Sequence, residues 1–282
     1  MRVEPRLTGQ RAASIVADDT NTHVQDHARS TFFFGMSILL MLLVLIGFGP
    51  TLYFRPFFDV PPIPGYLYLH GWILTGWYVL LVAQTSLIQT ARAPIHRRLG
   101  ILGALWGVLV VVGGQIATLN MVERVASLGV DLDATVGGVS VAAVLSGAVW
   151  SSVESSCEFA ILVATAVLLR RRSEAHKRLM LLASILSVGA AVNRIADWQI
   201  LGGGGSTSPI PFGPFGPIAM WLLVAALVAH DLMTFRRVHV ATLVGGALVV
   251  LHTFGLPSGL IASSELGVAF TRSLQYLDNH AE

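Results

Sequence analysis

Seven apolar segments limit the fold of this chain more than any other feature of its sequence. A helix needs about twenty apolar residues to cross a hydrocarbon core of roughly 30 Å. The segments that approach this length are 31–53, 67–90, 99–119, 151–169, 179–200, 218–235 and 240–254. Backbone polar groups inside a bilayer must be satisfied within the protein, so we expect each segment to be an α-helix. The predicted fold class is an all-α, polytopic transmembrane helical bundle of about seven spans.

The composition supports this class and excludes several functions. Of the 282 residues, 54% are hydrophobic and 12% are charged, whereas soluble domains contain about 25% charged residues. No surface is basic enough to predict a nucleic-acid partner, so the expected partner is the lipid bilayer. The single cysteine, Cys157, excludes a disulfide framework within one chain. The common soluble-enzyme motifs are absent from the sequence, so whether the protein is an enzyme stays open.

Basic residues predict the orientation of the spans. The loop 170–178 between the fourth and fifth spans carries five of the eighteen lysines and arginines. The amino-terminal tail carries four more, the turn 92–98 carries three, and the turn 236–237 carries two. Basic loops resist translocation, so we expect all of them on the cytoplasmic side, with the amino terminus inside and the carboxyl terminus outside.

The same pattern predicts three parts of the chain. Residues 1–30 would be a mobile cytoplasmic tail, residues 31–255 a seven-helix transmembrane domain, and residues 256–282 a short outer segment. One stretch is ambiguous, because residues 139–169 are apolar for much longer than one crossing requires. Residues 139–150 are either a helical extension of the fourth span or a helix that lies on the outer surface.

Ionisable side chains lie inside four of the predicted spans, where each is costly and calls for a partner or a purpose. They are His70, Glu154, Glu158, Arg194, Asp197 and His252. With a rise of about 1.5 Å per residue from the inner end of each helix, we expect them all in the outer half of the membrane. Glu154 and Glu158 share a helix face because they are four positions apart. The sequence therefore predicts an outward-facing polar pocket that binds a cofactor.

Two kinds of chemistry fit such a pocket. His70 and His252, on different helices, could ligate a haem iron, or could bind a transition metal together with the carboxylates. Arg194 could hold a haem propionate or another anion through charge-assisted hydrogen bonds. In the alternative interpretation, Arg194 pairs with Glu154 or Asp197, and the two histidines make ordinary hydrogen bonds at the membrane interface.

Three further histidines form a second candidate set at the inner ends of their helices. His96, His176 and His239 all lie among arginines, a setting in which contact with water or lipid phosphate is the ordinary role. The alternative is a metal or haem site at the inner face.

Three motifs carry a resemblance to a known family. They are Tyr-Leu-His-Gly-Trp around His70, His-Arg-Arg-Leu-Gly from His96, and Glu-Ala-His-Lys-Arg-Leu-Met from Glu174. Together they span roughly residues 61–198 and resemble a family of uncharacterised bacterial multi-pass membrane proteins. The resemblance implies a multi-helix fold in the bacterial inner membrane and no particular activity. The His-Lys-Arg-Leu-Met element is also similar to one in small membrane proteins linked to haem–copper oxidase assembly.

Two function hypotheses follow. The first is a redox-related or cofactor-binding membrane protein with its site in the outer pocket. The second is a small-solute transporter, or an accessory subunit that binds a membrane-protein partner or a second copy of itself. Transporters commonly contain interrupted helices. Apart from Pro50 near the end of the first segment, proline lies outside the predicted spans, which predicts unbroken spans and counts against transport.

Overall fold

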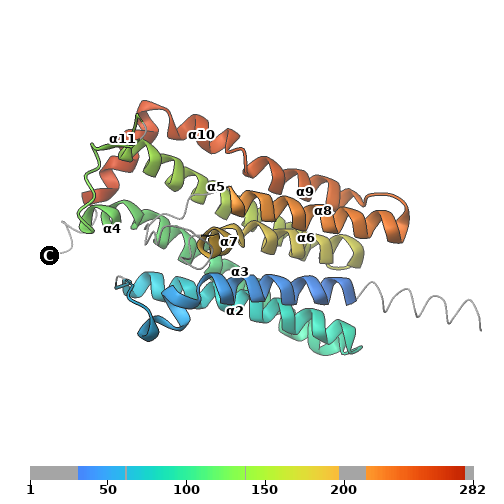
Figure 1. Ribbon diagram of the computed structural model, residues 1–282. Helices are drawn as coiled ribbons and strands as arrows, with labels where there is room; N and C mark the ends of the chain where they lie inside the picture. Colours follow the sequence, from blue (N-terminus) through green and yellow to red (C-terminus); the bar gives the residue numbers. More distant parts are fainter. Residues whose placement is uncertain (1–30, 61, 137, 197–213, 277–282) are drawn as a thin grey trace, which may run out of the picture.

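The computed structural model describes residues 31–60, 62–136, 138–196 and 214–276. The tail 1–30 and Asp197 therefore lie outside the described residues. Almost all of the described secondary structure is helical (Figure 1), which confirms the predicted all-α class. The exception is a short hairpin of two antiparallel strands, β1 (Thr135–Val136) and β2 (Val139–Ser140).

Six described helices are long and apolar enough to cross a membrane. They are Gly65–Gln89, Ala93–Leu119, Val141–Leu168, Ser173–Ala196, Phe215–Phe235 and Val240–Ala262. A seventh apolar helix, Thr31–Gly47, is shorter, and a π-helical turn, Gly49–Tyr53, follows it directly. The helical path of the first predicted span therefore reaches its expected end at residue 53. The chain is a multi-pass helical membrane protein, and its described residues contain six long candidate spans and one shorter apolar helix.

Four of the long spans are uninterrupted helices, and three of these are α2 (Gly65–Gln89), α3 (Ala93–Leu119) and α8 (Phe215–Phe235). Helix α3 begins before its predicted start at residue 99, because Pro94 stands in the first turn, where a missing amide hydrogen costs nothing. Short elements close the ends of the bundle. They are the 3₁₀ turns Arg55–Phe57 and Leu274–Tyr276 and the helices α4 (Met121–Ser127) and α11 (Glu265–Ser273).

The ambiguous stretch 139–169 folds as one helix, α5 (Val141–Leu168). The hydroxyl of Ser140 caps it by accepting a hydrogen bond from the amide of Ala143 at 3.2 Å. Residues 141–150 are thus a helical extension of the fourth span, and the surface-helix alternative is wrong. With 28 residues, α5 is about 42 Å long.

The fifth and seventh spans are interrupted. The fifth consists of α6 (Ser173–Leu186) and α7 (Gly189–Ala196). The seventh consists of α9 (Val240–His252) and α10 (Leu256–Ala262), separated by a turn in which Gly255 has a φ of +58°. The prediction of unbroken spans is therefore wrong at both. Ser187 and Gly189 flank the first break, and at the second Gly255 is followed by Pro257 in the first turn of α10, beyond the predicted end of that span.

Helix α5 lies at the centre of the bundle, packed against α3, α6, α9, α10 and α11. The main hydrophobic core includes Leu40, Leu182, Ile185 and Leu227, all fully buried. The spacing of Gly100, Gly103, Gly107 and Gly114 predicts a closely packed face on α3, and Gly107 does pack closely. A methyl group on Gly107 would lie 3.4 Å from the side chains of Trp77 and Val163, on α2 and α5 respectively.

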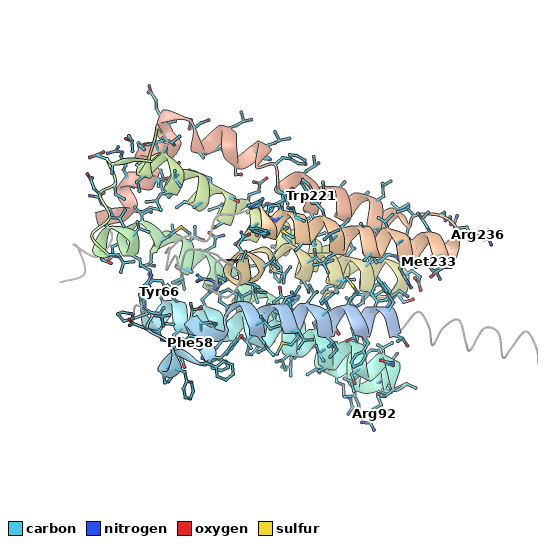
Figure 2. All side chains as sticks on the ribbon, in the orientation of Figure 1. Phe58, Tyr66, Arg92, Trp221, Met233 and Arg236 are labelled. Carbon is cyan, nitrogen blue, oxygen red and sulfur yellow. The ribbon has the colours of Figure 1, made fainter. Side chains whose placement is uncertain are left out.

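The basic turns share one end of the bundle. Figure 1 shows the start of the Thr31 helix and the α2–α3, α5–α6 and α8–α9 turns at the right-hand end. Figure 2 labels Arg92 and Arg236 there, whereas Phe58 and Tyr66 lie at the other end. We call the first the basic end and the second the opposite end. This arrangement is the one that the predicted orientation requires.

Candidate metal centre

Two carboxylates of α5 and one imidazole of α9 meet inside the bundle. Nδ1 of His252 lies 3.0 Å from Oε2 of Glu158 and 4.0 Å from Oε2 of Glu154. The three ligand atoms all lie within 4.8 Å of one another. Among the described residues, these side chains form the one such group of three or more histidine, cysteine or acidic ligands. We call Glu154, Glu158 and His252 the metal centre.

Local structure explains why these side chains converge. Glu154 and Glu158 are one helical turn apart and point from the same face near the middle of α5. His252 is the last residue of α9 before the seventh span breaks. Helix α9 can approach because Gly245 faces the core, where a methyl group would come within 2.8 Å of Leu182. The three side chains are between 11% and 14% exposed.

Hydrogen bonding within the chain leaves this group unsatisfied. The His252–Glu158 separation is short enough for an ion pair, but the angles are not those of a hydrogen bond. Nδ1 of His252 and Oε2 of both glutamates are buried without a hydrogen-bond partner among the described residues. A buried polar atom left in this state costs about 1–3 kcal/mol, and more when charged. The group therefore favours a species that binds all three atoms at once.

A divalent metal ion meets this requirement. Zinc binds imidazole nitrogen and carboxylate oxygen at about 2.0–2.2 Å, which places tetrahedral ligand atoms about 3.4 Å apart. The observed separations of 3.0 Å and 4.0 Å lie on either side of this value. Two ionised carboxylates would also balance the charge of a divalent ion, and three protein ligands leave coordination positions open.

A cavity of about 1010 Å³ adjoins the metal centre, and His252 forms part of its wall. The cavity begins near Phe58 at the opposite end and reaches Tyr78 and Phe159 in the interior of the bundle. Four serines of α5 line it, Ser151, Ser152, Ser155 and Ser156. Apolar side chains make up much of the wall, and neither Glu154 nor Glu158 is part of it.

The remaining predicted pocket residues do not join the metal centre. His70 lines the same cavity, but its ring lies beside Gly113 and Gly114 of α3. Ser156 of α5 lies near the same place, 3.4 Å from a methyl group built on Gly114. Ser156 and Glu158 point about 200° apart around α5, so His70 lies near a side of this helix other than the one that carries Glu158. Arg194 also lines the cavity, with its guanidinium 5.2 Å from the ring centre of Phe48.

The inner histidine pair does come together. The ring centres of His96 and His176 are 6.3 Å apart, with the rings nearly perpendicular. Nδ1 of His176 is 2.8 Å from the carbonyl oxygen of Ala166, and the side-chain amide of Gln84 can donate to Nδ1 of His96. Each ring therefore already has a hydrogen-bond partner, and no acidic ligand completes a metal group with them among the described residues.

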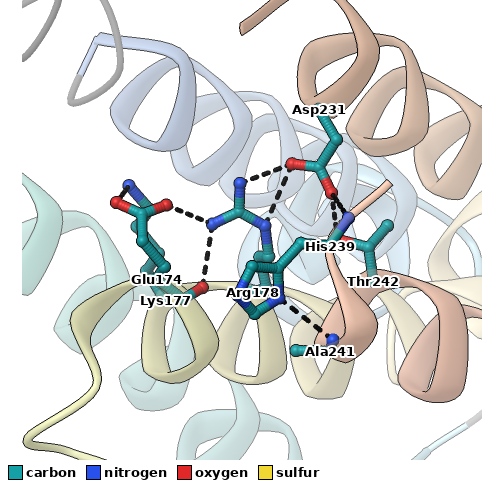
Figure 3. A network of polar contacts seen from close by, with 7 residues as sticks. All are labelled: Glu174, Lys177, Arg178, Asp231, His239, Ala241 and Thr242. Atoms are coloured by element: carbon teal, nitrogen blue, oxygen red, sulfur yellow. Dashed lines mark hydrogen bonds and ion pairs between the residues drawn. The ribbon is translucent and has the colours of Figure 1, made fainter. Parts of the chain in front are cut away.

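Sequence reasoning missed a polar network at the basic end (Figure 3). Arg178, fully buried on α6, donates from Nε to Oδ1 of Asp231 on α8 at 3.0 Å, and its Nη2 binds the same oxygen. Its Nη1 donates to the side chain and the carbonyl of Glu174. The other oxygen of Asp231 accepts from the amide of His239 and the hydroxyl of Thr242. The arginine of the His-Lys-Arg-Leu-Met motif thus links three helices.

This network also sets the protonation of His239, which precedes α9. Its Nδ1 accepts a hydrogen bond from the amide of Ala241 at 3.0 Å and so caps the helix. Burial, followed by the positive charge of Arg178, lowers the pKa of His239 below its ordinary value of 6.5. A protonated Nδ1 could not accept the capping hydrogen bond, so the neutral ring belongs to the folded state.

Comparisons with protein-family models, with curated proteins and with solved structures find no match to this chain. The resemblance of its three motifs to a bacterial membrane-protein family therefore stays a prediction.

Proposed function

We propose that this protein is a membrane protein that binds a divalent first-row transition metal between α5 and α9. The convergence of Glu154, Glu158 and His252 carries the proposal, because three unsatisfied ligand atoms from two helices lie within 4.8 Å. Zn²⁺, Mn²⁺ and Fe²⁺ all suit a mixed set of carboxylate and imidazole ligands.

The ligand set favours a metal ion over the haem alternative. Haem iron takes histidine, methionine, cysteine or tyrosine as axial ligands, and carboxylates are not among them. A haem held by two histidines would need His70 opposite His252, and His70 lies near Ser156, on another side of α5. The metal-ion proposal uses the three side chains that do meet, and it requires no redox chemistry.

We also propose that the basic end faces the cytoplasm. Two points support this orientation. Basic loops generally stay on the cytoplasmic side, and Arg92 and Arg236 lie at the same end of the bundle (Figure 2). In this orientation the tail 1–30 is cytoplasmic, the chain after the seventh span is outside, and the cavity opens toward the outer surface.

Metal binding to the purified protein tests the proposal. Equilibrium dialysis in detergent against Zn²⁺, Mn²⁺ and Co²⁺ should give one bound ion per chain, with a Co²⁺ visible spectrum typical of low coordination number. Glu158→Gln should weaken binding by about tenfold or more, because it removes a charged ligand. The matched control is Glu265→Gln, an exposed glutamate on α11. Equal binding by Glu158→Gln and the wild type would overturn the assignment of this site.

A further inference from the structure

The two interrupted spans meet the cavity at their breaks. Ser187 and Gly189, at the break in the fifth span, line the cavity, as do His252 and Gly255 at the break in the seventh. His252 is both a ligand of the metal centre and the last residue before a break. Residues at interrupted helices can change position without unfolding a whole span, and many transporters place their ion sites at such helices.

The cavity lies toward the opposite end of the bundle. Its wall includes Phe58 and Leu128, which are 49% and 43% exposed at that end. Phe254, beside the break in the seventh span, is also an exposed part of its wall. Toward the basic end it stops at Tyr78 and Phe159, both almost fully buried. Beyond these residues lie the hydrophobic core and the network around Arg178. A cation could therefore reach the metal centre from the opposite end, while its way to the basic end is closed.

Aromatic side chains of α2 hold the closed side together at the break in the fifth span. The hydroxyl of Tyr78 donates to the carbonyl oxygen of Ser184 at 2.8 Å, and Nε1 of Trp77 donates to the hydroxyl of Ser184 at 3.0 Å. In an unbroken helix this carbonyl would accept from the amide of Val188, which instead bonds Ile185. Tyr78 thus satisfies a carbonyl that the break has released. We call Trp77, Tyr78 and Phe159 the aromatic floor.

We infer that the divalent cation of the metal centre is itself a transported solute. This inference rests on the proposed function. The cation enters through the cavity and binds Glu154, Glu158 and His252. It leaves toward the basic end when α7 and α10 move at their breaks and the aromatic floor separates from Ser184. Two carboxylates select a divalent ion, because a monovalent ion leaves one of the buried charges unbalanced.

Flux into proteoliposomes tests the inference. Protein is reconstituted around a dye that responds to Zn²⁺ or Mn²⁺, and the ion is added outside. We expect saturable influx above that of protein-free liposomes for the wild type and none for Glu158→Gln. Tyr78→Phe, which removes the hydrogen bond to Ser184, should raise the flux about fivefold while metal affinity stays within twofold. Tyr68→Phe, on the exposed side of α2, is the matched control.

A second variant acts in the opposite direction. Gly255→Ala places a side chain at a φ of +58°, which restricts the turn between α9 and α10, so the flux should fall at least about threefold with binding unchanged. Wild-type protein that binds the metal in dialysis but gives no flux would overturn transport and leave the metal centre in place. Failure to bind any of the metals in dialysis would overturn the proposed function itself. Normal flux in both Tyr78→Phe and Gly255→Ala would overturn the role of the breaks.

Discussion

Arg178 and Asp231 form an ion pair in which neither side chain is exposed to solvent. The pair joins α6 to α8 across 53 positions of sequence, and every nitrogen of the guanidinium has an acceptor (Figure 3). A pair of this kind adds little stability relative to apolar side chains, but the loss of one partner leaves a buried charge unbalanced.

Asp231→Asn should therefore lower the free energy of unfolding by about 3–5 kcal/mol, because Arg178 keeps its charge and loses its counter-ion. The matched control is Glu174→Gln, whose carboxylate also binds Arg178 but is 36% exposed, so its loss should cost about 1 kcal/mol or less. Thermal unfolding in detergent, followed by intrinsic fluorescence, measures both. Equal losses in the two variants would contradict the assigned importance of the buried partner.

The stability of the protein should depend on the protonation of His239. The pKa of the folded-state ring lies below 6.5, through burial and the charges of Arg178 and Arg237, which outweigh Asp231 and Glu174. This contribution to stability is full above pH 6.5 and is lost as the pH falls through the folded-state pKa.

His239→Asn tests this dependence, because asparagine still caps a helix and does not titrate. Between pH 7.5 and pH 5, the unfolding temperature of the wild type should fall further than that of the variant. Other histidines titrate equally in both proteins, so the difference between the two curves reports His239. Parallel curves would contradict the prediction.

Close packing of the first helix on α7 depends on Gly47. A methyl group there would lie 2.3 Å from the carbonyl oxygen of Ala191, so Gly47→Ala should destabilise the protein by about 1–3 kcal/mol. Gly35, on the same helix, has open space at the equivalent position, and Gly35→Ala should be neutral or slightly stabilising. Unfolding temperatures of the two variants should therefore move in different directions.

Bound metal should stabilise the folded protein. At a free concentration of about one hundred times Kd, a ligand that binds only the folded state adds about 2.7 kcal/mol. We expect Zn²⁺ to raise the unfolding temperature of the wild type, a chelator to reverse the rise, and His252→Gln to abolish it. His96→Gln removes a histidine outside the metal centre and should keep the full response. A response that survives His252→Gln would place the ion elsewhere.

Much of this structure follows from local sequence patterns. The lengths of the apolar segments predict the spans, and the glycine spacing on α3 predicts its packed face. The spacing of Glu154 and Glu158 predicts a shared face, and their depth along the chain groups them with His252, but equally with His70 and Arg194, which do not join them. These features depend on helix geometry, which is the same in any context.

The features that sequence reasoning missed depend on contacts between distant residues. The break in the fifth span leaves a carbonyl that Tyr78 satisfies from another helix, and nothing in residues 179–200 alone indicates this. Arg178 was interpreted as part of a cytoplasmic basic loop, although it is fully buried. One signal was available, because Asp231 is the one acidic residue at the end of the sixth span, close to the basic turn that follows.

The length of α5 bears on how the protein meets water. At an average tilt of about 20°, a helix of about 42 Å extends about 9 Å beyond a hydrocarbon core of roughly 30 Å. On α5, Leu145 and Val149 are fully buried beneath α4 and Leu274, and Ser146 bonds the carbonyl of Ala262. The carboxyl-terminal helices therefore cover part of the apolar surface at the end of α5. A chain cut after Phe254 would expose that part to water and would be expected to aggregate.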